Sequence, residues 1–142
     1  MSTTDDILAI QHLVARWCDA INRRDFAAAA ACFATDGVWA PPGSEARGRA
    51  EIEALLEQLV GPQELLVQFA ANPLIDLRGD SASARWQVLE VGRTPDGKNL
   101  TILGTYDDRL TRTAGEWQFL ERRFSFLMFA THEGDAMVHP FG

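Results

Sequence analysis

The second half of this chain constrains its fold most, because it consists of four long β-type segments separated by short turns. The segments are rich in Val, Ile, Leu, Thr and aromatic residues and cover 65–77, 81–92, 100–113 and 116–129. The breaks between them are Arg78-Gly79-Asp80, Thr94-Pro95-Asp96-Gly97 and Ala114-Gly115. These are compositions typical of hairpin turns. The sequence therefore predicts four strands in an antiparallel meander.

The first helix is predicted from an apolar periodicity at spacings of three and four residues. That spacing places the apolar side chains on one buried stripe, made of Ile7, Ile10, Val14, Trp17 and Ile21. A capping signal stands at its start, in Thr3, Thr4 and Asp5.

Two further helices and a short strand are predicted before the meander. Asp25 can cap a helix over 26–33, which the sequence Thr35-Asp36-Gly37 is expected to stop. Val38-Trp39 then forms a short strand that ends at Pro41-Pro42-Gly43. The third helix covers 49–60, with Ile52, Leu55, Leu56 and Leu59 on its apolar side.

Helices followed by a sheet predict an α+β domain with the helices packed on one face of a curved sheet. At 142 residues, the chain is expected to form a single domain over 1–142, with a core of its own. Its 46% hydrophobic and 23% charged residues are ordinary for a globular protein and give no sign of disorder.

Charge and composition exclude several classes of partner. A net charge of −7 argues against nucleic acid and anionic membranes, which an acidic surface repels. No apolar run approaches the roughly 20 residues that a membrane span needs, and the start Met-Ser-Thr-Thr-Asp-Asp is no signal peptide. Cys18 and Cys32, on apolar faces of predicted helices, are interpreted as reduced buried thiols. We therefore expect a cytoplasmic location.

Four short motifs occur in a characteristic order: GR-x-EI at 48–52, RGD at 78–80, G-x-YDD-x-L at 104–110 and GEW at 115–117. With the element order, they resemble the SnoaL-like branch of the nuclear transport factor 2-like superfamily over nearly the whole chain. The resemblance implies a cone-shaped curved antiparallel sheet, wrapped by three N-terminal helices around one apolar pocket. It also implies a homodimer formed through the outer face of the sheet. Members include polyketide cyclases, scytalone dehydratase, ketosteroid isomerases and hexachlorocyclohexane dehydrochlorinase, but also catalytically silent subunits.

The dehydratase and dehydrochlorinase members use an Asp–His pair, and this chain departs from it at both positions. The matching residues are Asn22, in DAINRRDF, and Gln68, in LLVQFAANPLI. An aspartate makes a neighbouring histidine a stronger base, whereas amides cannot hold a proton taken from carbon. Asn22 and Gln68 are therefore expected to bind and polarise a substrate rather than to act as bases.

Strand alternation predicts which side chains share the pocket face. If Gln68 faces the pocket, four sets of residues line it together with Trp17 and Trp39: Leu66, Gln68 and Ala70; Ala84, Trp86, Val88 and Glu90; Ile102, Gly104, Tyr106 and Asp108; Leu120, Arg122, Phe124 and Phe126. The substrate-binding wall is expected to comprise Trp17, Trp39, Trp86, Val88, Ile102, Phe124 and Phe126. Such a wall favours a flat, apolar ligand.

Two charged residues fall on this apolar face, where burying an unpaired charge is expensive. Arg122 is either an anion or oxyanion holder or a structural ion pair with Glu90 or Asp108. Glu90 is the candidate base, because an apolar pocket would raise its pKa towards neutrality. A salt bridge to Arg122 would instead leave Glu90 a structural anion. Tyr106 is either a hydrogen-bond donor to a substrate carbonyl or a core tyrosine.

Two functions remain open on these residues. The first is a cofactor-independent lyase or isomerase acting on a small hydrophobic carbonyl-bearing or polycyclic substrate, with Asn22, Gln68, Tyr106, Arg122 and Glu90 as its catalytic residues. The second is a non-catalytic ligand-binding protein or partner subunit that has lost the Asp–His pair. The polar groups kept in an otherwise apolar cavity favour the enzyme. No metal or cofactor is expected, because His132 and His139 lack a ligand spacing and no phosphate-binding glycine loop is present.

Overall fold

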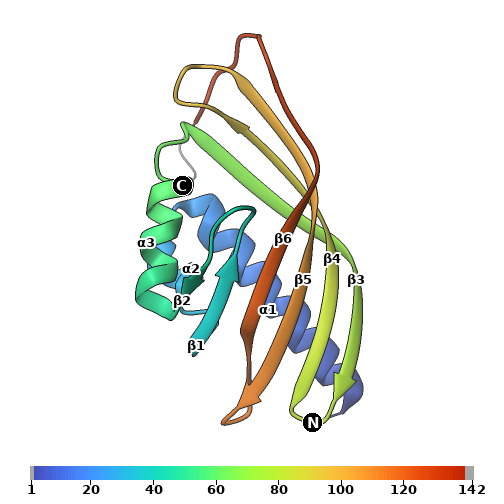
Figure 1. The fold of residues 1–142 in the computed structure, drawn as a ribbon. Helices are drawn as coiled ribbons and strands as arrows, with labels where there is room; N and C mark the ends of the chain where they lie inside the picture. The colour runs from blue at the N-terminus through green and yellow to red at the C-terminus, as the bar shows by residue number, and fades with distance from the viewer. Residues whose placement is uncertain (1, 140–142) are drawn as a thin grey trace.

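The computed structural model describes residues 2–139, in which three helices lie against one side of a curved six-stranded sheet (Figure 1). The strand order is β2-β1-β6-β5-β4-β3. This arrangement confirms the predicted α+β class. The sheet is curved but does not close, and the helices fill the space on its inner side.

Helix α1, Thr3–Arg23, runs along the sheet and buries the predicted apolar stripe. Ile10, Val14, Trp17 and Ile21 are buried, while Ile7 at the first turn is half-exposed. The cap is Ser2, one residue before the predicted signal, and it forms a capping box with Asp5. The helix ends where Arg24 adopts a left-handed conformation.

The segment after α1 differs from the prediction. Asp25 caps α2 as expected, but α2 covers only Phe26–Ala30, so Cys32 lies beyond its end. Strand β1, Phe33–Ala40, begins well before the predicted start and contains Thr35-Asp36-Gly37, at which its register with β6 shifts. The early start has a packing cause, because Phe33 is fully buried against the rings of Trp17 and Phe119.

Strand β2, Ala46–Arg47, pairs with β1, and helix α3, Arg49–Leu59, follows directly. Ile52 and Leu56 of α3 are fully buried, Leu55 is partly buried and Leu59 is partly exposed. The helix therefore covers the sheet with the predicted apolar side.

The remaining strands confirm the antiparallel meander: β3, Leu65–Arg78; β4, Ser81–Arg93; β5, Asn99–Thr113; β6, Glu116–His132. Strand β1 pairs with β6 in parallel, which brings the first strand of the chain beside the last (Figure 1). This pairing attaches the N-terminal half of the chain, which contains the helices, to the edge of the meander.

Two β-bulges in β6 change which of its side chains face inward. The register shifts between Arg109 and Leu110 and again between Leu103 and Gly104. At the first bulge Leu120 is displaced outward and Phe119 takes the inner position. The predicted inward placement of Leu120 was therefore wrong, because a bulge adds one residue and reverses the alternation beyond it.

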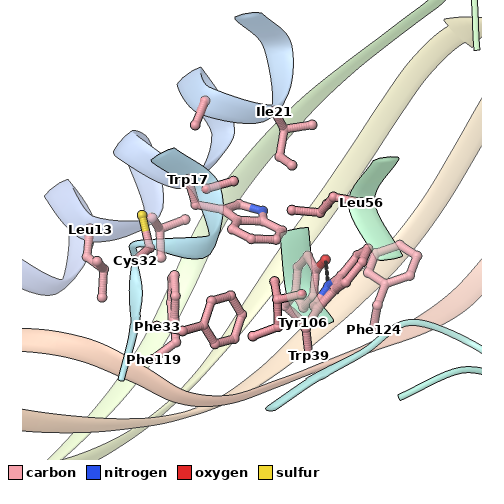
Figure 2. Packing of buried hydrophobic residues seen from close by; sticks show 14 of the residues in the cluster. Leu13, Trp17, Ile21, Cys32, Phe33, Trp39, Leu56, Tyr106, Phe119 and Phe124 are labelled. Carbon is pink, nitrogen blue, oxygen red and sulfur yellow. Dashed lines mark hydrogen bonds between the residues drawn. The ribbon is translucent and has the colours of Figure 1, made fainter. Parts of the chain in front are cut away.

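An aromatic cluster forms the centre of the core (Figure 2). The Trp17 ring lies within 5.6–6.3 Å of the rings of Phe33, Trp39, Tyr106 and Phe119, measured between centroids. Cys32 is buried and Cys18 half-buried, and both thiols are free. Within residues 2–139, no helix has the length and apolarity that crossing a membrane requires.

The tail after β6 has no regular secondary structure over 133–139, and residues 140–142 lie outside the described part of the chain. The carbonyl oxygen of Gly134 accepts hydrogen bonds from Arg93 and Asn99. These bonds tie the tail to the adjoining ends of β4 and β5.

Candidate active site

A cavity of about 260 Å³ lies between the helices and the inner face of the sheet. Most of its lining is apolar or aromatic. The predicted residues Trp17, Trp39, Ile102, Phe124 and Phe126 line it, joined by the predicted polar residues Gln68, Glu90 and Tyr106. Figure 2 shows how Leu56 of α3 and Ile21 of α1 approach these rings from the helical side.

The polar end of the cavity is a chain of three side chains drawn from α1, β3 and β4. The Trp17 indole N–H donates to Oε1 of Gln68 at 2.7 Å, and Nε2 of Gln68 donates to Oε1 of Glu90 at 3.1 Å. Gln68 and Glu90 are direct cross-strand partners, which explains why both side chains reach the cavity. All three residues are buried.

Burial raises the pKa of Glu90 to about 7, and the hydrogen bond from Gln68 lowers it only partly. Among residues 2–139 no cation offsets this burial, because Arg122 pairs with Asp108 and the alternative salt bridge to Glu90 does not form. Glu90 could have been a base in an apolar pocket or a structural anion paired with Arg122. Its position in the structure, unpaired in an apolar cavity, fits the first of these. Such a group can both take and give a proton near neutral pH.

Asn22 does not line the cavity. Its side chain instead holds the backbone of Gln68, where Oδ1 accepts from the N–H at 2.7 Å and Nδ2 donates to the carbonyl oxygen at 3.3 Å. The two amides at the expected Asp–His positions are therefore adjacent. One of them anchors the strand and the other contacts Glu90.

The Tyr106 hydroxyl lies beside Trp39, whose indole N–H donates to it at 3.0 Å (Figure 2). Burial raises the pKa of Tyr106 far above neutrality, so the phenol keeps its proton. Because its oxygen accepts from Trp39, its own hydrogen is left to donate to a ligand. The geometry thus fits the donor alternative at this position.

Arg122 is fully buried in an ion pair with Asp108, at 2.7 Å and 3.1 Å for its two hydrogen bonds. The ring of Tyr106 lies 3.8 Å from the guanidinium carbon and that of Phe119 4.2 Å. Arg122 is absent from the cavity lining. Arg122 therefore forms the structural ion pair, with Asp108 as its partner. It does not reach the cavity, as an oxyanion holder would have to.

Two predicted wall residues also lie outside the lining. Trp86 and Val88 are buried on the predicted face of β4 but lie further along the strand than the cavity extends. Trp86 instead borders a shallow groove between α1 and β3. Alternation identifies the face of a strand, but it does not tell where along that face a cavity ends.

Sequence reasoning also missed part of the lining, which α3, three loops, β5 and the bulged strand β6 supply: Pro41, Pro42, Leu56, Leu59, Val60, Gln63, Thr94, Leu100 and Phe129. The apolar side of α3 was the signal available for Leu56 and Leu59. Phe129 had none, because the second bulge in β6 shifts the alternation and brings it to the same side as Phe126.

A curved, unclosed sheet covered by helices on its inner side defines the nuclear transport factor 2-like fold, and this chain has that fold. The sequence model of the SnoaL-like domain family matches residues 2–123 of this chain. The chain belongs to the SnoaL-like family.

Solved structures support the same placement. A Mycobacterium tuberculosis protein of unknown function is 30% identical, with a TM-score of 0.79 over 89% of this chain and 76% of that one. A Novosphingobium aromaticivorans protein provisionally assigned as an aromatic ring hydroxylase is 25% identical, with a TM-score of 0.85 over 93% and 96%. Hexachlorocyclohexane dehydrochlorinase type 3 from Novosphingobium barchaimii, at 19% identity, has a TM-score of 0.88 over 96% and 97%. A search of curated proteins found no match.

Proposed function

We propose that this protein is a cofactor-independent lyase or isomerase that uses Glu90 as its general base on a small carbonyl-bearing molecule. The observation that carries this proposal is the buried carboxyl group of Glu90, which lines an aromatic cavity and has no cation paired with it in the described part of the chain. With a pKa of about 7, Glu90 is deprotonated in a large share of molecules at neutral pH. Its carboxylate is then a stronger base than an ordinary glutamate, whose pKa is lower.

The reaction begins with the substrate carbonyl oxygen accepting a hydrogen bond from Tyr106. This bond stabilises negative charge on that oxygen and makes a proton on the neighbouring carbon more acidic. Glu90 removes that proton, and the C–H electron pair forms an enolate. An isomerase returns the proton from Glu90 to a different carbon, whereas a lyase expels a leaving group as the enolate collapses.

The cavity restricts the size and charge of the substrate. Its volume of about 260 Å³ is small beside the roughly 300–1,000 Å³ typical of ligand pockets, which favours one or two rings over the polycyclic substrates also considered. Within the described lining, Glu90 is the acidic residue and no Lys or Arg is present. A neutral substrate suits this lining better than an anionic one.

The fold shared with a dehydrochlorinase, an elimination enzyme by its name, is consistent with a lyase. The alternative is a non-catalytic ligand-binding protein of the same fold. The observation that favours it is the engagement of Asn22 and Gln68 with the protein itself, which leaves neither of these amides in the role of the Asp–His pair.

The test has two stages. Native mass spectrometry of the purified protein identifies a bound molecule, and a panel of one- and two-ring ketones is then screened for exchange of α-protons in D₂O by NMR. We expect exchange that increases with pH through about 7 and falls about 10²- to 10⁴-fold in Glu90→Gln. Glu57→Gln, at an exposed position of α3, is the matched control.

Exchange that persists in Glu90→Gln would contradict the role of Glu90. Ketones that bind in the cavity but exchange no protons at any pH would favour the ligand-binding protein instead.

A further inference from the structure

The side-chain amide of Gln68 lies between the indole of Trp17 and the carboxyl group of Glu90, hydrogen-bonded to both. We propose that Trp17, acting through Gln68, is a positioning residue that fixes which oxygen of Glu90 exchanges a proton with a ligand. The inference rests on the proposed function for its chemical meaning, but the effect of Trp17 and Gln68 on the proton affinity of Glu90 can be measured without any turnover.

The Gln68 amide can take only one of its two orientations. An indole N–H can donate a hydrogen bond but cannot accept one. The 2.7 Å contact from Trp17 therefore requires the amide oxygen of Gln68 on its side. The amide nitrogen must then face Glu90, and it can only donate.

The two oxygens of Glu90 have different surroundings. Oε1 accepts the N–H of Gln68, which favours the form in which this oxygen carries no proton. Oε2 has no hydrogen-bond partner within residues 2–139. It is not fully buried either, so a molecule in the cavity can reach it. Since Glu90 lines the cavity, Oε2 is the oxygen that meets a ligand.

Helix α1 also holds the backbone of Gln68 in place. Asn22 bonds both backbone polar groups of Gln68, so two hydrogen bonds hold the strand to α1 at this point. Trp17 and Asn22 both belong to α1. One helix therefore fixes the backbone and the side chain of the residue that contacts Glu90.

The other ionisable groups around Glu90 do not compete for this role. The negative charge of Glu90 acts on Tyr106 of β5 and on Cys18 of α1. Burial raises the pKa of both of these groups, so both are neutral near pH 7. The charge of Arg122 on β6 is engaged by Asp108. The lining that α3, β1 and β6 contribute is apolar or aromatic.

The experiment removes only the indole N–H, by Trp17→benzothienylalanine, in which sulfur replaces the nitrogen and both rings remain. The amide of Gln68 is then free to turn its oxygen towards Glu90, which favours the protonated carboxyl group. We expect the pKa of Glu90 to rise from about 7 by roughly one unit, a tenfold change in proton affinity. The measurement is a ¹³C NMR titration of labelled glutamate carboxyls, with Glu90 assigned by Glu90→Gln.

The matched control is the same replacement at Trp117, whose indole N–H donates to Asp6 at 3.0 Å near the start of α1. It should leave the titration of Glu90 unchanged. Gln68→Met, which keeps Trp17 and removes the amide donor, should raise the pKa of Glu90 in the same direction. If the Trp17 variant does not fold, Gln68→Met still tests the second link of the chain, the hydrogen bond from Gln68 to Glu90.

A pKa of Glu90 that stays at its wild-type value in Gln68→Met, or in a folded Trp17 variant, would overturn the inference. Failure of the proposed function would look different. Glu90 would then respond to these replacements as expected, while proton exchange of bound ketones would be the same in the wild type and in Glu90→Gln.

Discussion

Glu90 and Asp108 are both buried carboxyl groups on the inner side of the sheet, yet their partners differ. Asp108 receives two hydrogen bonds from the guanidinium of Arg122, whereas Glu90 receives one from a neutral amide. A cationic partner compensates a buried negative charge far better than an amide does. This difference assigns Asp108 to structure and leaves Glu90 available for proton transfer.

The pKa of Glu90 predicts a pH-dependent stability. Its value of about 7 in the folded protein exceeds the ordinary 4.5, so between these values the folded state binds more protons than the unfolded state. The free energy of unfolding should therefore fall as the pH rises from 4.5 and level off above about 7, by about 3 kcal/mol in total. Urea denaturation of wild type and Glu90→Gln across this range measures the difference. A difference independent of pH, as expected for Glu57→Gln, would refute the shifted pKa.

At the scale of elements, the Arg122–Asp108 pair joins β6 to β5, whose residues 108 and 122 are direct cross-strand partners. Arg122→Met should lower the free energy of unfolding by about 3–5 kcal/mol, because it leaves Asp108 buried without its cation. The double variant Asp108→Leu with Arg122→Met should recover most of this loss. Chemical denaturation of both variants checks the prediction, and a double variant no more stable than the single one would contradict it.

Among the elements, the meander depends on local sequence, whereas the start of β1 and the bulges of β6 depend on distant residues. The hairpins of the meander follow from local turn residues, and they were predicted within a few residues. The early start of β1 and the two bulges in β6 were not, because they depend on partners far away in the sequence. Phe33 packs on Trp17 and Phe119, and the bulges exist only in the pairing of β6 with β5.

At the scale of the whole molecule, the outer face of the sheet carries an apolar row across four strands. Phe69, Leu89, Leu103 and Met128 are consecutive cross-strand partners, with exposed fractions of 55%, 38%, 38% and 43%. Nearby, Arg85, Asp107 and Arg123 form a parallel row of alternating charge. We propose that a second copy of this chain covers the apolar row, because a row of mixed sign can face a copy of itself.

Light scattering after size-exclusion chromatography tests this dimer. Leu103→Glu places a charge in the middle of the row and should convert a dimer into a monomer. The control is Leu8→Glu, on the exposed side of α1, where Leu8 is 57% exposed. A wild-type protein that elutes as a monomer at high concentration would refute the proposed interface.

The sequence by itself determined the fold class, the meander, the apolar stripe of α1 and the face of the sheet that lines the cavity. These features depend on local periodicity and turn chemistry, which neighbouring residues carry. Only the tertiary structure decided the roles of the polar residues. Arg122 could pair with Asp108 or Glu90, and the pairing with Asp108 is what leaves Glu90 uncompensated. A pKa depends on the burial and partners that the whole fold supplies. For that reason the sequence could name Glu90 as a candidate base but could not decide between a base and a structural anion.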